Sequence, residues 1–201
     1  MAPVITNLGT YHRLIRLLDS RGASYRIIDH VEEGKTDAVS VLRGHPLRNA
    51  AKCIVVRVGI SKRSRRYILS VVPGDRHVDL ERVRVLANGK DIGFARPDIA
   101  EQLAGSVAGS IIPFSFNSEL DLVVDRSLLG CREIFFNAAR LDRSIALSCA
   151  DYLSIAGPRI ACIARAADGD DHLAAMNEAS EGGAQIERPA GREPFSPDDA
   201  A

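Results

Sequence analysis

The stretch Ala50-Ala51-Lys52-Cys53-Ile54-Val55-Val56-Arg57-Val58 decides the fold prediction for this chain. Its β-branched residues predict a strand from Cys53 to Val58 that is covered on both faces. Lys52 stands at the mouth of this strand, so its cation either reaches solvent or faces a cleft. Because side chains alternate along a strand, Cys53 is expected to point into the core when Lys52 points outward. For Lys52 taken alone, a solvated lysine is the simpler interpretation.

Turn residues divide the rest of the chain into short helices and strands. A polar loop joins the strand at Cys53–Val58 to a second strand at Tyr67–Val72, as in an antiparallel hairpin. Further strands are expected at Tyr25–Asp29, Leu122–Val124, Glu133–Asn137, Ile145–Leu147 and Arg159–Ala164. Helices are expected to start at or next to Thr10, Lys35, Asp79, Pro97 and Ser148. Hairpins mixed with helices predict an α+β fold with a mixed, largely antiparallel sheet.

The charge of the chain is unevenly distributed. The 201 residues carry 26 basic and 26 acidic side chains. Residues 165–201 hold nine acids and three bases, whereas residues 1–164 hold 17 acids and 23 bases, so the two parts carry −6 and +6. The scarcity of apolar periodicity and the many Gly, Pro and Asp residues predict a disordered acidic tail at 165–201, after one domain at 1–164.

Several classes of protein are not indicated. The chain has no apolar run near the roughly 20 residues of a membrane span and no export signal, so we expect a cytoplasmic protein without a membrane partner. A disulfide framework and a metal site are not expected, because the four cysteines include no CxxC pair. A P-loop, a dinucleotide fingerprint and a G-x-S-x-G elbow are all missing, and no cofactor is expected.

Five local motifs follow one another in a distinctive order and spacing. They are Lys52 before the apolar strand, Val72-Pro73-Gly74-Asp75, Gly109-x-x-x-Pro113, Asp125-x-Ser127-Leu128-Leu129 and Phe136-Asn137-Ala138-Ala139. Together they resemble the YbaK/prolyl-tRNA synthetase-associated domain family over about residues 10 to 164. The resemblance implies a barrel-like sheet flanked by helices. It also implies hydrolysis of the ester between a wrong amino acid and tRNA.

The resemblance assigns roles to two regions. Lys52 matches the main functional lysine of the family and would hold a phosphate or terminal hydroxyl of tRNA. Backbone amides of the loop at 109–113 would surround the amino-acid carbonyl, because glycine lets a ligand approach the main chain. The loop consists of Gly109, Ser110, Ile111, Ile112 and Pro113. In the family, the substrate's own ribose hydroxyl activates the water. For the loop, an ordinary helix-to-strand connection is the alternative.

Other residues have weaker assignments. Asn137, Ala138 and His30 are expected to border the pocket, although Asn137 could simply close a strand end and a structural role is the favoured interpretation of His30. Cys53 beside Lys52 is a conceivable nucleophile, which strand alternation disfavours. The basic loop is either a solvated hairpin tip or a contact for the tRNA backbone. Its cations are Lys62, Arg63, Arg65 and Arg66.

Two functions of different classes remain open. The first is a trans-editing deacylase for a small noncognate amino acid, namely Ala, Ser or Thr, with Cys on the proline tRNA as runner-up. Members that act on alanyl-tRNA often carry Gly and then His after the Asn-Ala pair. Here Ala139 and Arg140 follow instead, which weakens the alanine assignment. The second function is a module that binds tRNA or another protein without turnover. An aminoacyl-tRNA synthetase is a further partner that the resemblance implies.

Overall fold

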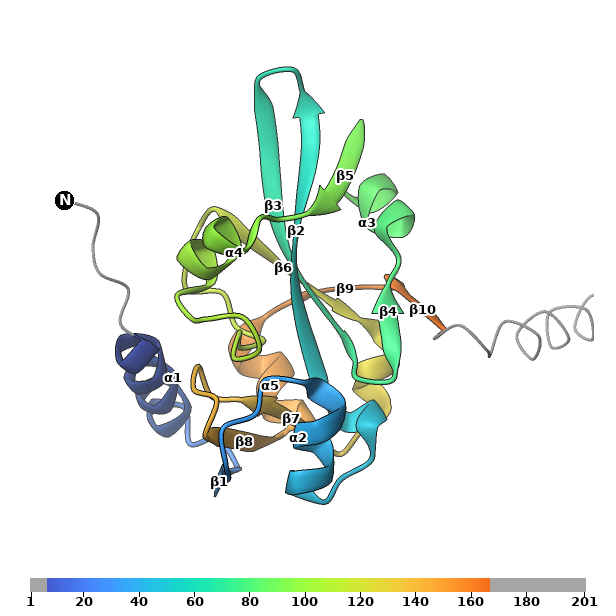
Figure 1. Ribbon diagram of the computed structural model, residues 1–201. Helices are drawn as coiled ribbons and strands as arrows, with labels where there is room; N and C mark the ends of the chain where they lie inside the picture. The colour runs from blue at the N-terminus through green and yellow to red at the C-terminus, as the bar shows by residue number, and fades with distance from the viewer. Residues whose placement is uncertain (1–6, 167–201) are drawn as a thin grey trace, which may run out of the picture. The chain divides into compact units, whose positions relative to one another are not determined.

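The computed structural model describes residues 7–166, which form five α-helices, two short 3-10 helices and ten strands (Figure 1). The helices are α1 (Asn7–Ser20), α2 (Thr36–Arg43), η1 (Leu47–Asn49), α3 (Leu80–Leu86), α4 (Pro97–Ala104), η2 (Arg126–Gly130) and α5 (Cys149–Ala156). The strands are β1 (Tyr25–Asp29), β2 (Ala51–Ser61), β3 (Ser64–Pro73), β4 (Arg76–Val78), β5 (Asp91–Phe94), β6 (Leu120–Asp125), β7 (Glu133–Asn137), β8 (Arg143–Ser148), β9 (Arg159–Ala161) and β10 (Ala164–Ala166).

The largest sheet is built around the predicted hairpin of β2 and β3. Its strand order is β5-β2-β3-β6-β9. β2 pairs antiparallel with β3 and β5, whereas β6 pairs parallel with β3 and β9. In Figure 1 the hairpin projects beyond the neighbouring helices. β5 covers β2 only from Val56 to Gly59, so residues 51–54 have no neighbour in this sheet on the side opposite β3.

A second, antiparallel sheet has the order β1-β8-β7. A single parallel bridge between Ala50 and Phe135 joins its β7 strand to the start of β2. This bridge brings the Phe135–Asn137 segment to the uncovered part of β2, although the two segments are far apart in the sequence. A third sheet pairs β4 with β10.

Alternation along β2 divides its side chains between two hydrophobic clusters. Ala51 and Val55 belong to the cluster that α1, α5 and the three-stranded sheet complete. Val56 and Val58 belong to the cluster that α3 completes. Cys53 packs against the first cluster, which confirms the predicted direction of its side chain.

Capping residues place most helix ends where the sequence indicates them. The carboxylate of Asp79 and the hydroxyl of Ser148 each accept a backbone N–H at the start of α3 and α5. Gly105 ends α4 with φ +70°, a conformation that glycine adopts without strain. Thr10 is an exception, because α1 already begins at Asn7. The Thr10 hydroxyl instead donates to the carbonyl of Gly105 at 2.6 Å.

The strand expected at 159–164 is in fact two strands, β9 and β10, which belong to different sheets. The cause is Asp125, whose carboxylate accepts the backbone N–H groups of Ile163 and Ala164 at 2.6 and 2.7 Å. This turns the chain out of the five-stranded sheet and toward β4. The α+β class and the largely antiparallel pairing are confirmed. The described strands do not close into a barrel; they form three sheets.

The acidic tail predicted at 165–201 lies outside the described residues, except for Arg165 and Ala166. These two residues are part of β10, where they pair with β4. β10 therefore extends two residues past the expected domain boundary. No helix within residues 7–166 is both long and apolar enough to cross a membrane.

Candidate active site

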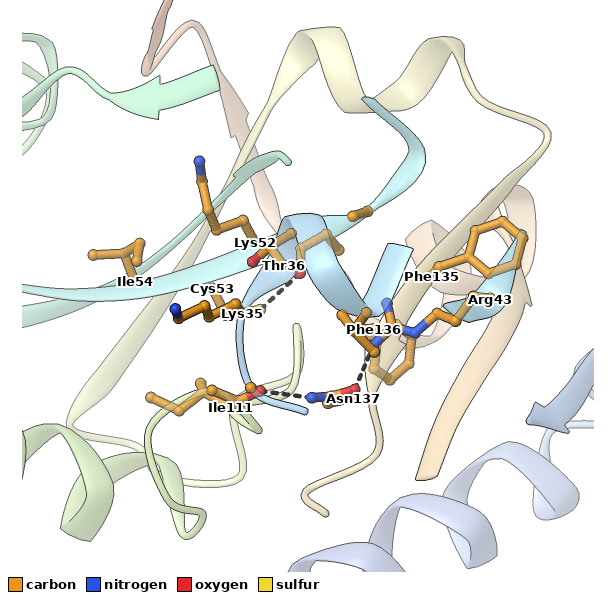
Figure 2. A pocket seen from close by; sticks show the side chains of 15 residues that line it. Lys35, Thr36, Arg43, Lys52, Cys53, Ile54, Ile111, Phe135, Phe136 and Asn137 are labelled. Carbon is orange, nitrogen blue, oxygen red and sulfur yellow. Dashed lines mark hydrogen bonds between the residues drawn. The ribbon is translucent and has the colours of Figure 1, made fainter. Parts of the chain in front are cut away.

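A pocket of about 350 Å³ lies where the uncovered start of β2 meets the end of β7 and the loops that precede α2 and β6 (Figure 2). Its volume falls near the lower end of the roughly 300 to 1,000 Å³ usual for small-molecule sites. Four residues predicted from the sequence line it: Lys52, Gly109, Ile111 and Asn137. The tertiary structure thus collects residues from three separate motifs in one place.

Lys52 is half-buried in the pocket wall, and the turn after β3 holds its ammonium group. Nζ donates to the carbonyl oxygen of Gly74 at 3.1 Å and to that of Arg76. Burial lowers the pKa of Lys52, and the nearby Asp75 carboxylate partly offsets this effect. In Figure 2 the group points away from Ile111. An ammonium group has three N–H donors, so one remains for a ligand.

Cys53 lines the pocket from the opposite face of β2. Its Sγ lies 3.6 Å from the carbonyl oxygen of Ala51, and its side chain packs against the first hydrophobic cluster. Burial raises the pKa of the Cys53 thiol well above its usual range, because a thiolate would lose its hydration there. The thiol is therefore poorly suited to act as a nucleophile.

The loop between α4 and β6 meets the loop before α2 backbone to backbone. Gly109 has φ +82°, and a Cβ atom on it would lie 2.8 Å from the Cα of Gly34. Both observations explain why glycine is needed at 109. The backbone N–H and the hydroxyl of Ser110 both donate to the carbonyl of Val107 at 3.0 Å. Gly109 and Ile111 line the pocket, and their backbone N–H groups have no recorded acceptor within residues 7–166.

Four other predicted residues lie behind the pocket and do not line it. Ser110 and Ala138 are completely buried, Ile112 is 1% exposed, and Pro113 is buried as well. They support the pocket wall from the core. The sequence predicted that the whole loop at 109–113 surrounds the substrate carbonyl. Only Gly109 and Ile111 of this loop line the pocket.

Asn137 ties the two glycine loops together. Its Nδ2 donates to the carbonyl oxygens of Glu33 and Gly109, both at 2.8 Å. Its Oδ1 accepts hydrogen bonds from Ser144 Oγ at 2.9 Å and from Arg43 Nη2. Figure 2 shows the contact with Arg43. An amide that only closed a strand end would not bridge two loops. Asn137 is therefore part of the framework of the pocket.

Two cations that line the pocket, Lys35 and Arg43, were not predicted from the sequence. The available signal was the helix expected to start at or next to Lys35: Lys35 directly precedes α2, and Arg43 is its last residue. Together with Lys52 they place three cations in the pocket, and none of its described lining residues is Asp or Glu. The first turn of α2 also borders it and adds partial positive charge through its free N–H groups. The pocket is therefore suited to an anionic or electron-rich ligand.

His30 does not line the pocket. Its Nε2 lies 2.6 Å from Ser144 Oγ, and its Nδ1 lies 2.7 Å from the carbonyl oxygen of Val31. Since Ser144 also contacts Asn137, His30 reaches the pocket only through another side chain. This arrangement matches the structural role that the sequence favoured for His30.

The basic hairpin tip lies far from the pocket. Its cations, Lys62, Arg63, Arg65 and Arg66, are exposed. Lys62 follows Lys52 by ten positions along β2 and the turn, which at about 3.3 Å per residue corresponds to roughly 30 Å. Arg66 also forms an ion pair with Asp121 at 2.6 Å. The tip cannot contact a ligand atom that is seated in the pocket.

Comparison with known families identifies the domain. Residues 30–155 match the model of the aminoacyl-tRNA editing domain. The chain belongs to this family. Two curated relatives, from Escherichia coli strains K12 and O157:H7, are each named multifunctional Ser/Thr-tRNA deacylase ProXp-y. Each is 38% identical over 162 residues, which is 79% of this chain and 95% of the relative.

Two solved structures share the fold. A candidate trans-editing enzyme for prolyl-tRNA synthetase matches with a TM-score of 0.65 and 18% identity, over 82% of this chain and 99% of that one. A hypothetical protein matches with a TM-score of 0.68 and 19% identity, over 76% and 99%. At such low identity these matches establish the fold alone.

Proposed function

We propose that the protein is a trans-editing hydrolase, which deacylates tRNA that carries a small noncognate amino acid. The observation that carries the proposal is one pocket that combines the family's lysine, Lys52, with Gly109 and Ile111, whose backbone N–H groups have no recorded acceptor within residues 7–166. Membership of the aminoacyl-tRNA editing family supports it, as does the 38% identity to relatives named as Ser/Thr-tRNA deacylases.

The geometry suits cleavage of an ester that is already activated. Such a reaction requires chiefly that the enzyme hold the carbonyl, stabilise the oxyanion and place a water. The N–H groups of Gly109 and Ile111 would receive the oxyanion. The third N–H of Lys52 would bind a phosphate or a terminal hydroxyl of the acceptor end.

Water is the attacking nucleophile in this proposal. Cys53 is disfavoured because burial raises the pKa of its thiol. Among the described lining residues there is no His, Asp or Glu that could serve as a general base. The ribose hydroxyl next to the ester would therefore orient and activate the water, as the family resemblance implies.

Serine and threonine are the proposed amino acids. The curated relatives are named as deacylases of Ser- and Thr-tRNA. In addition, the Ala139-Arg140 sequence after the Asn-Ala pair departs from the pattern common among alanine-specific members. Cysteine on the proline tRNA remains the second candidate. The partner is the aminoacylated end of tRNA, with an aminoacyl-tRNA synthetase as a further partner. Because charged tRNA is used in the cytoplasm, we place the protein there.

A panel of mischarged tRNAs tests the proposal. Serine, threonine, alanine and cysteine are each loaded on noncognate tRNAs, and release of the amino acid is followed with and without the protein. We expect multiple turnovers on Ser- or Thr-charged tRNA. Binding of tRNA without release of any amino acid would instead favour the alternative function, a binding module on the same fold.

A further inference from the structure

Arg43, the last residue of α2, is a half-buried cation without a carboxylate partner. None of the ion pairs recorded within residues 7–166 includes it. Its Nε donates to Ser144 Oγ at 2.8 Å and its Nη2 donates to Asn137 Oδ1. Burial lowers the pKa of Arg43 to about 10, because only neutral oxygens compensate for its lost hydration. Such a group is costly for stability, which points to a role in the pocket that it lines.

The donors that reach Asn137 Oδ1 fix the orientation of the amide. With Oδ1 facing Arg43 and Ser144, Nδ2 must face the carbonyl oxygens of Glu33 and Gly109, as the two 2.8 Å contacts record. A flipped amide would place two donors opposite the donors of Arg43. The position of the Gly109 loop thus depends on what holds Oδ1.

Ser144 alone cannot hold Oδ1, because its hydroxyl has a single proton and two acceptors within reach. The first acceptor is Asn137 Oδ1 at 2.9 Å. The second is His30 Nε2 at 2.6 Å, which accepts when it carries no proton. Arg43 has no such alternative, since a guanidinium only donates. Its Nη2 is therefore the one unshared donor to Oδ1 among the described contacts.

We propose that Arg43 is a positioning residue: it locks the Asn137 amide and, through it, the Gly109 loop whose N–H groups receive the substrate carbonyl. The catalytic half of this inference, that the loop receives the substrate carbonyl, rests on the proposed function. The structural half, that Arg43 holds the loops at Glu33 and Gly109, does not depend on the reaction.

Hydrogen–deuterium exchange on the protein without tRNA tests the structural half. Arg43→Met keeps the apolar stem and removes the donors. We expect exchange in residues 33–36 and 105–112 to become about tenfold faster, the effect of losing one hydrogen bond to a charged group, while the β2–β3 hairpin stays protected. Arg16→Met, on the exposed side of α1, is the matched control. Unchanged exchange in both loops of Arg43→Met would overturn the proposal.

Kinetics on the preferred mischarged tRNA test the catalytic half. Arg43→Met should lower kcat by roughly 10- to 100-fold with little change in KM, because the oxyanion donors are misplaced while the acceptor end still binds. In Arg43→Met/Asn137→Ala the loss should equal that of Asn137→Ala alone, since both act through one amide. An effect on KM alone, or additive losses in the double variant, would mean that Arg43 contacts tRNA directly and would overturn the positioning role.

Arg43→Lys separates geometry from charge. Lysine keeps the charge but cannot direct two fixed donors to Ser144 and Asn137 at once, so its kcat should stay near that of Arg43→Met. Full recovery with lysine would overturn the proposal. If the wild-type protein deacylates no tRNA at all, the proposed function fails, and the exchange experiment still decides whether Arg43 holds the two loops.

Discussion

Gly34 and Gly109 touch through their backbones: a Cβ atom on Gly109 would lie 2.8 Å from the Cα and 2.9 Å from the carbonyl oxygen of Gly34. The two glycines are far apart in the sequence. Asn137 contacts both of their loops, since it donates to the carbonyl of Glu33 in the first and to that of Gly109 in the second. One wall of the pocket is therefore formed where these two loops meet. A side chain at position 109 must therefore push the two loops apart.

Gly109→Val should abolish deacylation. The branched side chain clashes with Gly34, and φ +82° adds strain on the order of 1 to 3 kcal/mol for a non-glycine residue. Release of the amino acid and thermal unfolding measured on the same sample separate loss of the site from loss of the fold. Gly130→Ala, where a Cβ meets nothing within 4 Å, is the matched control. An active Gly109→Val protein would show that the pocket lies elsewhere.

Lys52→Ala should lower kcat/KM while the domain stays folded. Loss of one charge-assisted contact costs about 1.5 to 3 kcal/mol, or about 10- to 150-fold in rate. The carbonyls of Gly74 and Arg76 lie in a partly exposed turn, so water can replace the lysine there. Cys53→Ala, one residue along on the opposite face, is the control and should stay within a few-fold of wild type. Wild-type rates in Lys52→Ala would remove the lysine from the mechanism.

The pH dependence should report the titration of Lys52. Burial lowers the pKa of Lys52 below 10.5, so kcat/KM should begin to fall at a lower alkaline pH than it would with an exposed lysine. The rates are measured after subtraction of spontaneous hydrolysis of the ester. The unfolded state binds more protons between the two pKa values, so this residue makes stability rise with pH over that window. Activity and stability should thus change in opposite directions. In Lys52→Arg, which keeps its charge, an unmoved alkaline limb would assign the titration to another group.

Asp125→Asn should destabilise the domain by about 2 to 4 kcal/mol, because an amide NH₂ would face the backbone N–H groups of Ile163 and Ala164. Burial by itself raises the pKa of Asp125, but hydrogen bonds from Ser127, Ile163 and Ala164 together lower it below 3.8. Its stabilising effect is therefore complete above pH 3.8 and is lost as the pH falls through the lowered value.

Urea unfolding at neutral and acid pH measures both effects. Asp121→Asn, in the same strand, breaks only the exposed ion pair with Arg66 and should cost less than about 1 kcal/mol. Equal losses in the two variants would contradict the role assigned to Asp125.

Removal of residues 167–201 should leave the chemistry intact and raise tRNA affinity at low salt. This segment holds nine acids and two bases, so the remaining chain would carry 24 bases and 17 acids, a net charge of +7. Counterion release then favours tRNA binding, and salt suppresses the difference. The cut follows Ala166 because β10 ends there. Binding curves that superimpose at every salt concentration would show that the segment has no electrostatic role.

The sequence by itself determined the features that depend on local order. Alternation along Cys53–Val58 set Lys52 and Cys53 on opposite faces, and capping residues such as Asp79 and Ser148 placed the starts of helices. The spacing of the family motifs indicated the α+β editing fold and pointed to Lys52 and Gly109. These features depend on neighbours along the chain, so one sequence is enough to predict them.

The tertiary structure alone decided which residues meet. Asn137 contacts Arg43 and Gly109 across 94 and 28 positions, and no local periodicity encodes such contacts. The same holds for Asp125, whose two bonds to the chain near Ile163 split one predicted strand into two. Long-range hydrogen bonds of buried polar groups thus set the pocket, and they exist only once the chain has folded.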